Sequence, residues 1–209
     1  NAQPVVNDIS EAETRKLYID LLLREAGWKI AEHDGEIIPR IACTEIEVHG
    51  MPSESGVGYA DYVLFDTNGI PLAVVESKRT SVDAAKGRHQ AELYADCLAA
   101  KYACPRPVIY YTNGFVTNII DGIGYPSRPV MGFHTLDELR RLISQRGRND
   151  ITDLTISDEI TNRKYQKRGI ESVCRHYNDK HRRALLVMAT GTGKTRVSIS
   201  LVDVLVRNK

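Results

Sequence analysis

Two apolar runs separated by an Asn-Gly pair constrain the fold of this 209-residue chain more than any other feature. Tyr59–Phe65 precedes Asn68-Gly69, and Pro71–Glu76 follows it. An Asn-Gly pair between apolar runs is the strongest short-range hairpin signal, because both residues accept the positive φ angles of a tight turn. The pattern therefore predicts an antiparallel pair of strands, around which a larger buried sheet has to be built.

The register of this hairpin predicts a cluster of charged side chains on one face. If Asn68-Gly69 form a two-residue turn, Asp61 lies directly opposite Glu76, with Cβ atoms ~5 Å apart. Lys78 shares that face because strand side chains alternate with a period of two. Two carboxylates this close repel each other unless a cation lies between them, and hard oxygen ligands suit Mg²⁺. A ladder of surface salt bridges is the alternative interpretation.

Further helices and strands are predicted on both sides of the hairpin. Ser10 and Glu13 fit a capping box, which predicts a helix over 11–26 ending at Gly27. A second Asn-Gly pair at Asn113-Gly114 predicts another hairpin. The other predicted elements are a strand within 36–49, helices at 82–100 and from Leu136 to about Gln145, a helix at Arg163–Tyr177, a strand at Ala184–Met188 and a helix at Lys194–Val206.

A phosphate-binding loop is predicted near the end of the sequence. The apolar run Ala184–Met188 leads into Gly191-Thr192-Gly193-Lys194-Thr195 and then into a helix. Strand, glycine-rich turn and helix are the context in which backbone N–H groups surround a phosphate. Lys194 would contact the β- and γ-phosphates of ATP, and the Thr195 hydroxyl would bind Mg²⁺. Gly191 and Gly193 would let the backbone approach the phosphates closely.

Composition adds limits on the class of protein. The net charge is +1, but residues 1–147 carry 15 basic and 20 acidic side chains, whereas 148–209 carry 13 and 7. This change of sign predicts two units. No apolar run reaches the ~20 residues of a membrane helix. Four cysteines without a C-x-x-C pair indicate a reducing cytoplasmic protein without structural zinc. The chain starts at Asn1 rather than Met, so we expect a longer natural protein.

The hairpin residues resemble a known nuclease core. The segments 58–65 and 69–79 are similar to the PD-(D/E)xK fold, and more closely to the N-terminal nuclease domain of restriction (R) subunits of type I restriction–modification enzymes. Asp61, Glu76 and Lys78 match the motif position by position, whereas Ala60 replaces its proline. The resemblance implies a mixed sheet flanked by helices, of α/β class, and Mg²⁺-dependent cleavage of DNA at these three catalytic residues, with Asp61 and Glu76 as metal ligands.

Two neighbouring features extend this resemblance. Gln90 and Tyr94 match the Gln-x-x-x-Tyr element of restriction subunits, which implies that their helix face borders the metal and supports DNA binding. A plain helix with one polar and one half-buried residue is the alternative. Many nucleases of this superfamily also place an acidic residue of the first helix near the metal, and Glu13 is the candidate here. Glu13 is equally well explained as the third residue of the capping box.

The phosphate loop resembles motif I of superfamily 2 helicases and translocases, and that of the type I restriction motor in particular. Upstream, Arg163-Lys164-Tyr165-Gln166 is similar to the Q motif, which implies that Gln166 binds the adenine of ATP. An exposed helix glutamine is the alternative. Only 14 residues follow Thr195 in this 209-residue sequence, so the chain has no room for a Walker B strand or a second motor lobe. We therefore expect no ATP hydrolysis by this chain.

Together these resemblances imply an endonuclease and ATP-dependent DNA translocase subunit. The predicted domains are an endonuclease domain at 1–147, a linker at 148–162 and the first helix, strand, phosphate loop and helix of a RecA-like motor at 163–209. The implied partners are double-stranded DNA and the methylation and specificity subunits of a type I complex. Two alternatives remain: a superfamily 2 helicase with a degenerate, non-catalytic nuclease-like domain, and a nucleotide-binding protein whose hairpin is structural.

Overall fold

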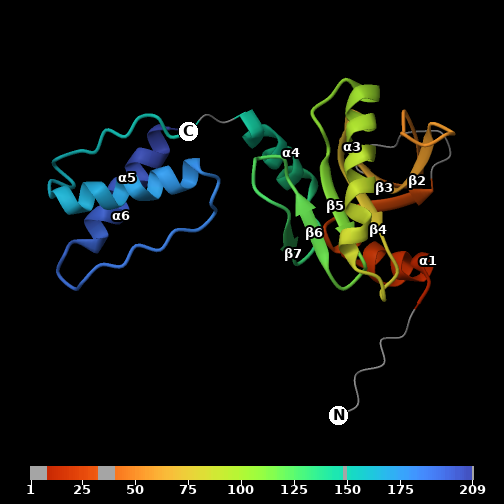
Figure 1. Cartoon of the computed structure of the whole chain (residues 1–209), viewed down its shortest axis with the longest axis horizontal. Coiled ribbons are helices and arrows are strands. Elements are labelled where there is room, and N and C mark those ends of the chain that lie inside the picture. Colours follow the sequence, from red (N-terminus) through yellow and green to blue (C-terminus); the bar gives the residue numbers. More distant parts are fainter. Residues whose placement is uncertain (1–8, 33–40, 148–149, 209) are drawn as a thin grey trace, which may run out of the picture. The chain divides into compact units, whose positions relative to one another are not determined.

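The structure is a computed structural model that describes residues 9–32, 41–147 and 150–208. It separates into two compact units, Asn1–Arg146 and Gly147–Lys209. The first unit contains the sheet, and the second contains two long helices (Figure 1). Within the described residues, every helix is too short or too polar to cross a membrane.

A seven-stranded mixed sheet forms the centre of the first unit, and its strands lie side by side in the order in which they occur in the sequence. Two neighbouring pairs, β1 with β2 and β4 with β5, are parallel, and the remaining neighbours are antiparallel. The strands are β1 (Lys29–Glu32), β2 (Ile41–His49), β3 (Val57–Phe65), β4 (Pro71–Ser77), β5 (Val108–Thr112), β6 (Thr117–Ile120) and β7 (Arg128–Val130).

Each face of the sheet packs against helices. One face holds Tyr62 and Leu64 against Ile19 and Leu23 of the helical segment 11–25 and against Leu139. The opposite face packs against α3 (Arg88–Tyr102). Along the central strands, successive residues point alternately to the first face and to this one. The strand residues of this second face include Cys43, Val63, Phe65, Val74 and Ile109. Figure 1 shows α3 running alongside β4 and β5. This period-two division confirms a mixed α/β sheet flanked by helices.

The first helical segment agrees with the predicted helix and contains one irregular turn. It comprises α1 (Glu11–Thr14), a π-helical turn (Arg15–Ile19) and α2 (Asp20–Glu25). The capping box of Ser10 and Glu13 is present, with the Glu13 N–H donating to Ser10 Oγ over 3.2 Å. Gly27 follows the helix with φ = +84°, as its predicted C-terminal stop requires. The π-helical turn has no counterpart in the prediction.

The central hairpin has the predicted register but a different turn. Tyr62 pairs with Val75 and Val63 with Val74, as the two-residue turn requires. However, the Gly69 N–H donates to the carbonyl of Asp66, and the pairing shifts between Leu64 and Phe65. The loop is therefore longer than predicted by one residue on one strand. A bulge absorbs that extra residue, so the strand register beyond it is unchanged.

Other predicted elements of the first unit are largely present. The helix expected over 82–100 begins as a 3₁₀ turn (Ala84–Gly87) and continues as α3. The second hairpin is confirmed, with Thr112 paired to Thr117. A capped α4 (Leu136–Ser144) and a 3₁₀ turn (Gln145–Gly147) follow. The strand predicted within 36–49 is β2, and its first five positions lie outside the described residues. Strands β1 and β7 were not predicted.

The second unit consists of α5 (Lys164–Asn178) and α6 (Lys194–Arg207), packed through Ile170, Cys174, Val197 and Val204. Both helices were predicted. The strand predicted at Ala184–Met188 is wrong for the described residues, because this apolar stretch has no paired strand beside it. The side chains of Leu185 and Val187 are 90% and 84% exposed.

The described part of the predicted linker belongs to this second unit. The N–H groups of Thr152 and Asp153 donate to Asn208 Oδ1 over 3.1 and 3.0 Å, and Thr161 Oγ1 lies 2.6 Å from Ser200 Oγ. Ile156 also packs against the core between the two helices. Residues 150–162 therefore pack with α5 and α6 instead of forming a free connection.

Candidate metal centre and phosphate loop

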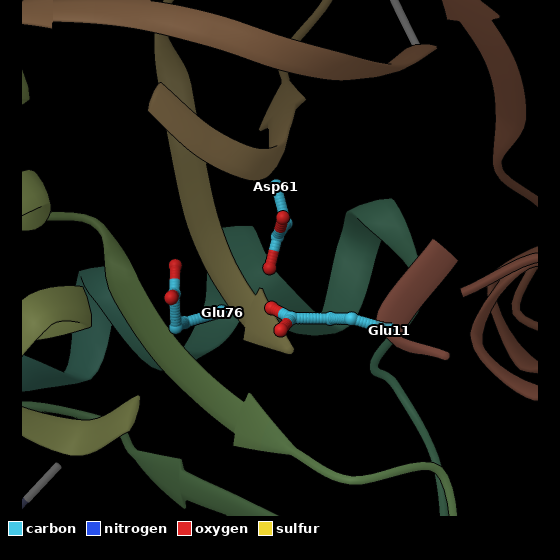
Figure 2. Close-up of side chains that lie close together, drawn as sticks. All are labelled: Glu11, Asp61 and Glu76. Atoms are coloured by element: carbon cyan, nitrogen blue, oxygen red, sulfur yellow. The ribbon is translucent and has the colours of Figure 1, made fainter. Parts of the chain in front are cut away.

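Three carboxylates from three different elements converge at one end of the central hairpin. Glu11 comes from the first turn of α1, Asp61 from β3 and Glu76 from β4, and one oxygen of each lies within 4.8 Å of the other two. Figure 2 shows the oxygens of Glu11 and Asp61 turned toward each other with Glu76 beside them. The structure thus brings Asp61 and Glu76 together, as the hairpin register predicted, and adds Glu11.

Glu76 is the most buried carboxylate of this cluster. Its relative exposure is only 2%, because β4 lies between β3 and β5. Burial, reinforced by the negative charge of Asp61, raises the pKa of Glu76 to about 7, although Lys78 opposes the shift. Within the described residues, Glu76 Oε2 is buried without a hydrogen-bond partner. A carboxylate oxygen in that position needs a proton or a cation.

Lys78 supplies a positive charge next to Glu76. Its Nζ donates to Glu76 Oε1 over 2.6 Å and lies 3.7 Å from Glu11 Oε1. Burial acts to lower the pKa of Lys78, but the hydrogen bond to Glu76 and the surrounding carboxylates outweigh it and raise that pKa. Lys78 therefore remains an ammonium group. Gly87 packs over this pair, since a Cβ atom there would lie 3.0 Å from Glu76 Cγ.

Asp61 is held by donors on both of its oxygens. Oδ2 accepts hydrogen bonds from the backbone N–H of Ser77, over 2.7 Å, and from Ser77 Oγ, over 2.6 Å. Oδ1 accepts from Arg15 Nη1 over 3.0 Å, and Arg15 Nη2 also binds Glu45 Oε1 over 3.0 Å. The carboxylate of Asp61 consequently has a defined orientation.

The predicted Gln90–Tyr94 pair borders the same cluster. Gln90 Nε2 donates to the Tyr94 hydroxyl over 2.7 Å, and Gln90 Oε1 lies 3.4 Å from Lys78 Nζ. Tyr94 is buried, and a Cβ atom at Gly58 would overlap its ring, so β3 approaches α3 closely there. Burial raises the pKa of Tyr94, which keeps its hydroxyl protonated. Their part in DNA binding stays a prediction.

The first helix contributes different residues from the one predicted. Glu13 caps the helix through Ser10, and these hydrogen bonds lower the pKa of the exposed Glu13 carboxyl. Glu11 is the glutamate that faces Asp61 and Glu76. Sequence reasoning missed Glu11 and Arg15, although their spacing of four residues places both on one helix face. The capping signal explains Glu13 completely, so no further role is needed for it.

The chemistry of these donors fits a hard divalent cation. Three carboxylates offer oxygen ligands within a few ångströms, and one buried oxygen of Glu76 lacks a partner among the described residues. Mg²⁺ and Mn²⁺ both prefer such oxygen donors. Glu76, Asp61 and Glu11 are the residues that could hold the cation.

The phosphate loop of the second unit has the backbone form that its glycines predict. Gly191 and Gly193 have φ angles of +79° and +86°, and α6 begins at Lys194 directly after them. Lys194 and Thr195 are exposed in the first turn of α6, and the helix has no side-chain cap. The loop and α5 line a cavity of about 410 Å³. An uncapped helix N-terminus beside such a cavity suits a phosphate group.

Gln166 connects the start of α5 to this loop. It is 3% exposed, and its Nε2 donates to the carbonyl of Thr192 over 2.7 Å. The hydroxyl of Tyr165 also donates to that carbonyl, over 2.9 Å. The predicted alternative of an exposed helix glutamine is therefore wrong for Gln166. Its contact with adenine stays a prediction.

Both units are similar to known protein families. The family described as type I restriction enzyme R protein N terminus matches residues 41–128. The family described as type III restriction enzyme, res subunit, matches residues 159–209. The first match contains Asp61, Glu76 and Lys78, and the second contains the phosphate loop.

Similar full-length proteins and one solved structure cover both units. The chain is 26% identical to the EcoKI type I restriction endonuclease subunit of Escherichia coli K12 over 97% of its length, and 25% identical to the EcoAI endonuclease subunit of Escherichia coli over 94%. A solved fragment described as an HsdR subunit of a type I restriction enzyme from Vibrio vulnificus YJ016 is 26% identical, with a TM-score of 0.51 over 95% of this chain and 38% of that one. The chain spans 22% and 25% of the two E. coli subunits.

Proposed function

The chain belongs to the R-subunit family of type I restriction enzymes, and from this premise we propose that its first unit is a divalent-metal-dependent DNA endonuclease domain. The single observation that supports this most is the buried Glu76, whose Oε2 lacks a partner among the described residues and whose neighbours are two more carboxylates. Such an arrangement is costly without a cation and favourable with one.

The proposed reaction is hydrolysis of a phosphodiester bond of double-stranded DNA. Asp61 and Glu76, with Glu11, would hold Mg²⁺, which supplies charge neutralisation at the phosphate and a water molecule of lowered pKa. Lys78, kept protonated by Glu76, would stabilise the negative charge that develops on the phosphate oxygens. Gln90, which contacts both Lys78 and Tyr94, would position Lys78, and together with Tyr94 it would support the DNA backbone from α3.

We propose that the second unit binds ATP as part of a DNA translocase. The backbone of Gly191, Thr192 and Gly193 would surround the phosphates, Lys194 would contact them, and Thr195 would bind Mg²⁺. Gln166 would contact the adenine, for which its position next to the loop is suitable. Positive φ angles at both glycines and the uncapped start of α6 support this assignment.

The proposed setting is a cytoplasmic restriction complex. The E. coli relatives are endonuclease subunits of type I restriction enzymes, so we propose methylation and specificity subunits as partners of this chain. Sequence recognition would then lie with the specificity subunit. We expect the 209-residue chain alone to cleave DNA weakly and without sequence preference.

Cleavage assays on the complete enzyme test the nuclease assignment. Glu76→Gln removes the buried charge without changing the side-chain shape, and Lys78→Met removes the ammonium group. We expect each change to abolish Mg²⁺-dependent cleavage while ATP hydrolysis persists. Lys101→Met is the matched control, since Lys101 is an exposed lysine at the far end of α3. Normal cleavage by either site variant would contradict the catalytic assignment and favour the alternative, a helicase with a non-catalytic nuclease-like domain.

A further inference from the structure

A chain of ion pairs reaches from the surface to Asp61 through Arg15. Arg15 donates through Nη1 to Asp61 Oδ1 and through Nη2 to Glu45 Oε1, both over 3.0 Å. The side chains of Arg15 and Asp61 are 21% and 15% exposed, whereas that of Glu45 is 67% exposed. The two arms of one guanidinium therefore join a surface carboxylate to a carboxylate of the metal centre.

The backbone is irregular at both partners of this bridge. The π-helical turn of the first helix begins at Arg15. Glu45 has φ = +53° within β2, a conformation that side chains other than glycine rarely adopt. Pairing on either side of it joins Thr44 to Tyr62 and Ile46 to Ala60, so Glu45 stands opposite Asp61. Such irregular turns and strained residues gather at functional sites.

An ordinary surface ion pair does not account for these features. A bridge to a carboxylate as exposed as Glu45 contributes little to folding, because water screens it. A strained φ angle at the same residue acts against folding. The bridge has a different consequence, since it fixes the end of the guanidinium that contacts Asp61.

We propose that Arg15, held in place by Glu45, is a positioning residue that sets the orientation of the Asp61 carboxylate for divalent-metal binding. This inference rests on the proposed metal centre. With Ser77 on Oδ2 and Arg15 on Oδ1, the carboxylate cannot rotate, and Oδ1 keeps a lone pair for the cation. Mutation of a residue that orients a metal ligand in this way typically lowers metal affinity by about 10–100-fold.

The shape of arginine is essential to this role, so a charge-conserving change is the sharpest test. Lysine at position 15 would keep the positive charge near Asp61 but could not direct two parallel donors to two carboxylates. Replacement by a neutral residue would be ambiguous, since loss of a positive charge by itself favours cation binding. Arg15→Lys separates orientation from charge.

The experiment measures Mn²⁺ binding by the 209-residue chain, with free Mn²⁺ quantified by electron paramagnetic resonance. For Arg15→Lys we expect binding weaker by roughly 10-fold or more. Glu45→Gln should weaken binding by a few-fold, and the double variant should bind no worse than Arg15→Lys alone, because both changes break the same bridge. Arg140→Lys is the matched control: Arg140 makes a similar pair with Asp66, at the hairpin turn, and binding should not change.

The outcomes separate this inference from the proposed function. If Asp61→Asn abolishes Mn²⁺ binding but Arg15→Lys and Glu45→Gln bind as the unmodified chain does, the positioning role is wrong and the metal centre stands. If the unmodified chain does not bind Mn²⁺, or Asp61→Asn does not matter, both are wrong. Circular dichroism establishes folding, and if Arg15→Lys does not fold, unchanged binding by Glu45→Gln overturns the inference and a few-fold loss supports it.

Discussion

The raised pKa of Glu76 makes this residue one source of pH dependence in the stability of the first unit. Burial raises its pKa to about 7 in the folded chain, from an ordinary value of 4.5. The folded state therefore holds this proton more tightly than the unfolded state. Its contribution to stability is greatest below about pH 4.5 and is lost as the pH rises through about 7. The loss is on the order of 3 kcal/mol, at ~1.4 kcal/mol per unit.

Urea unfolding with EDTA present, from pH 5 to pH 8.5, measures this effect. The unmodified chain should lose stability across that range, whereas Glu76→Gln should lose much less, since glutamine has no proton to release. Excess Mg²⁺ at pH 8 should restore stability to the unmodified chain only, because the cation binds the folded state. Parallel pH profiles for the two chains would rule out Glu76 as the source.

The two glutamates of the first helical turn provide a second prediction. Glu11→Gln should weaken Mn²⁺ binding several-fold, because Glu11 contributes a carboxylate to the cluster. Glu13→Gln should leave Mn²⁺ binding unchanged and only slightly lower the melting temperature, since Glu13 caps the helix at its exposed end. Titration of Mn²⁺ into each variant shows which of the two glutamates contributes to cation binding. Equal effects of the two changes would contradict the assignment of Glu11.

The sequence could predict only part of the candidate metal centre. Asp61 and Glu76 lie on adjacent strands and Lys78 directly follows the second, so strand periodicity and one turn were enough to place them together. Glu11 and Arg15 come from a helix whose position over the sheet depends on how Ile19 and Leu23 pack. No local pattern contains that information. Capping, which is local, drew attention to Glu13 instead.

The central hairpin has the predicted register although its turn differs from the predicted one. The extra loop residue is balanced by a bulge at Leu64/Phe65, so residues beyond the bulge keep their predicted partners. Both faces of the sheet are buried, so a slip of one residue would move Val63 from the face covered by α3 to the face covered by Ile19 and Leu23 and disrupt the packing on both. The strand predicted at Ala184–Met188 is absent because the described residues of the second unit contain no strand with which this apolar run could pair.

The contact between the phosphate loop and Gln166 of α5 can be tested by substitution of Gly193. Gly193→Ala should destabilise the second unit by at least about 1 kcal/mol, because alanine disfavours the positive φ angle. Its Cβ would also overlap Gln166 Nε2. Adding Gln166→Ala should relieve the overlap but not the φ strain, so only part of the loss should return. Thermal unfolding by far-ultraviolet circular dichroism measures both, and full recovery in the double variant would contradict the φ argument.

At the scale of the molecule, the two units should respond to ligands independently. Trp28 is the single tryptophan of the chain and is buried in the first unit, so its fluorescence reports that unit alone. We expect Mg²⁺ to raise the midpoint temperature of the unfolding transition reported by Trp28 in the unmodified chain and in Lys194→Ala, but not in Asp61→Asn. Gly193→Ala should leave the Trp28 transition unchanged. A shift of that transition by Gly193→Ala would show that the units unfold together.

The order of strands in the sheet has a consequence for how the chain folds as it is synthesised. Because each strand pairs with the strand before it in the sequence, the sheet can grow in the direction of synthesis without waiting for distant segments. Glu11 emerges first, Asp61 follows, and Glu76 joins them only when β4 closes on β3. A nascent chain therefore has no complete acidic cluster until Glu76 has been made and β4 has paired.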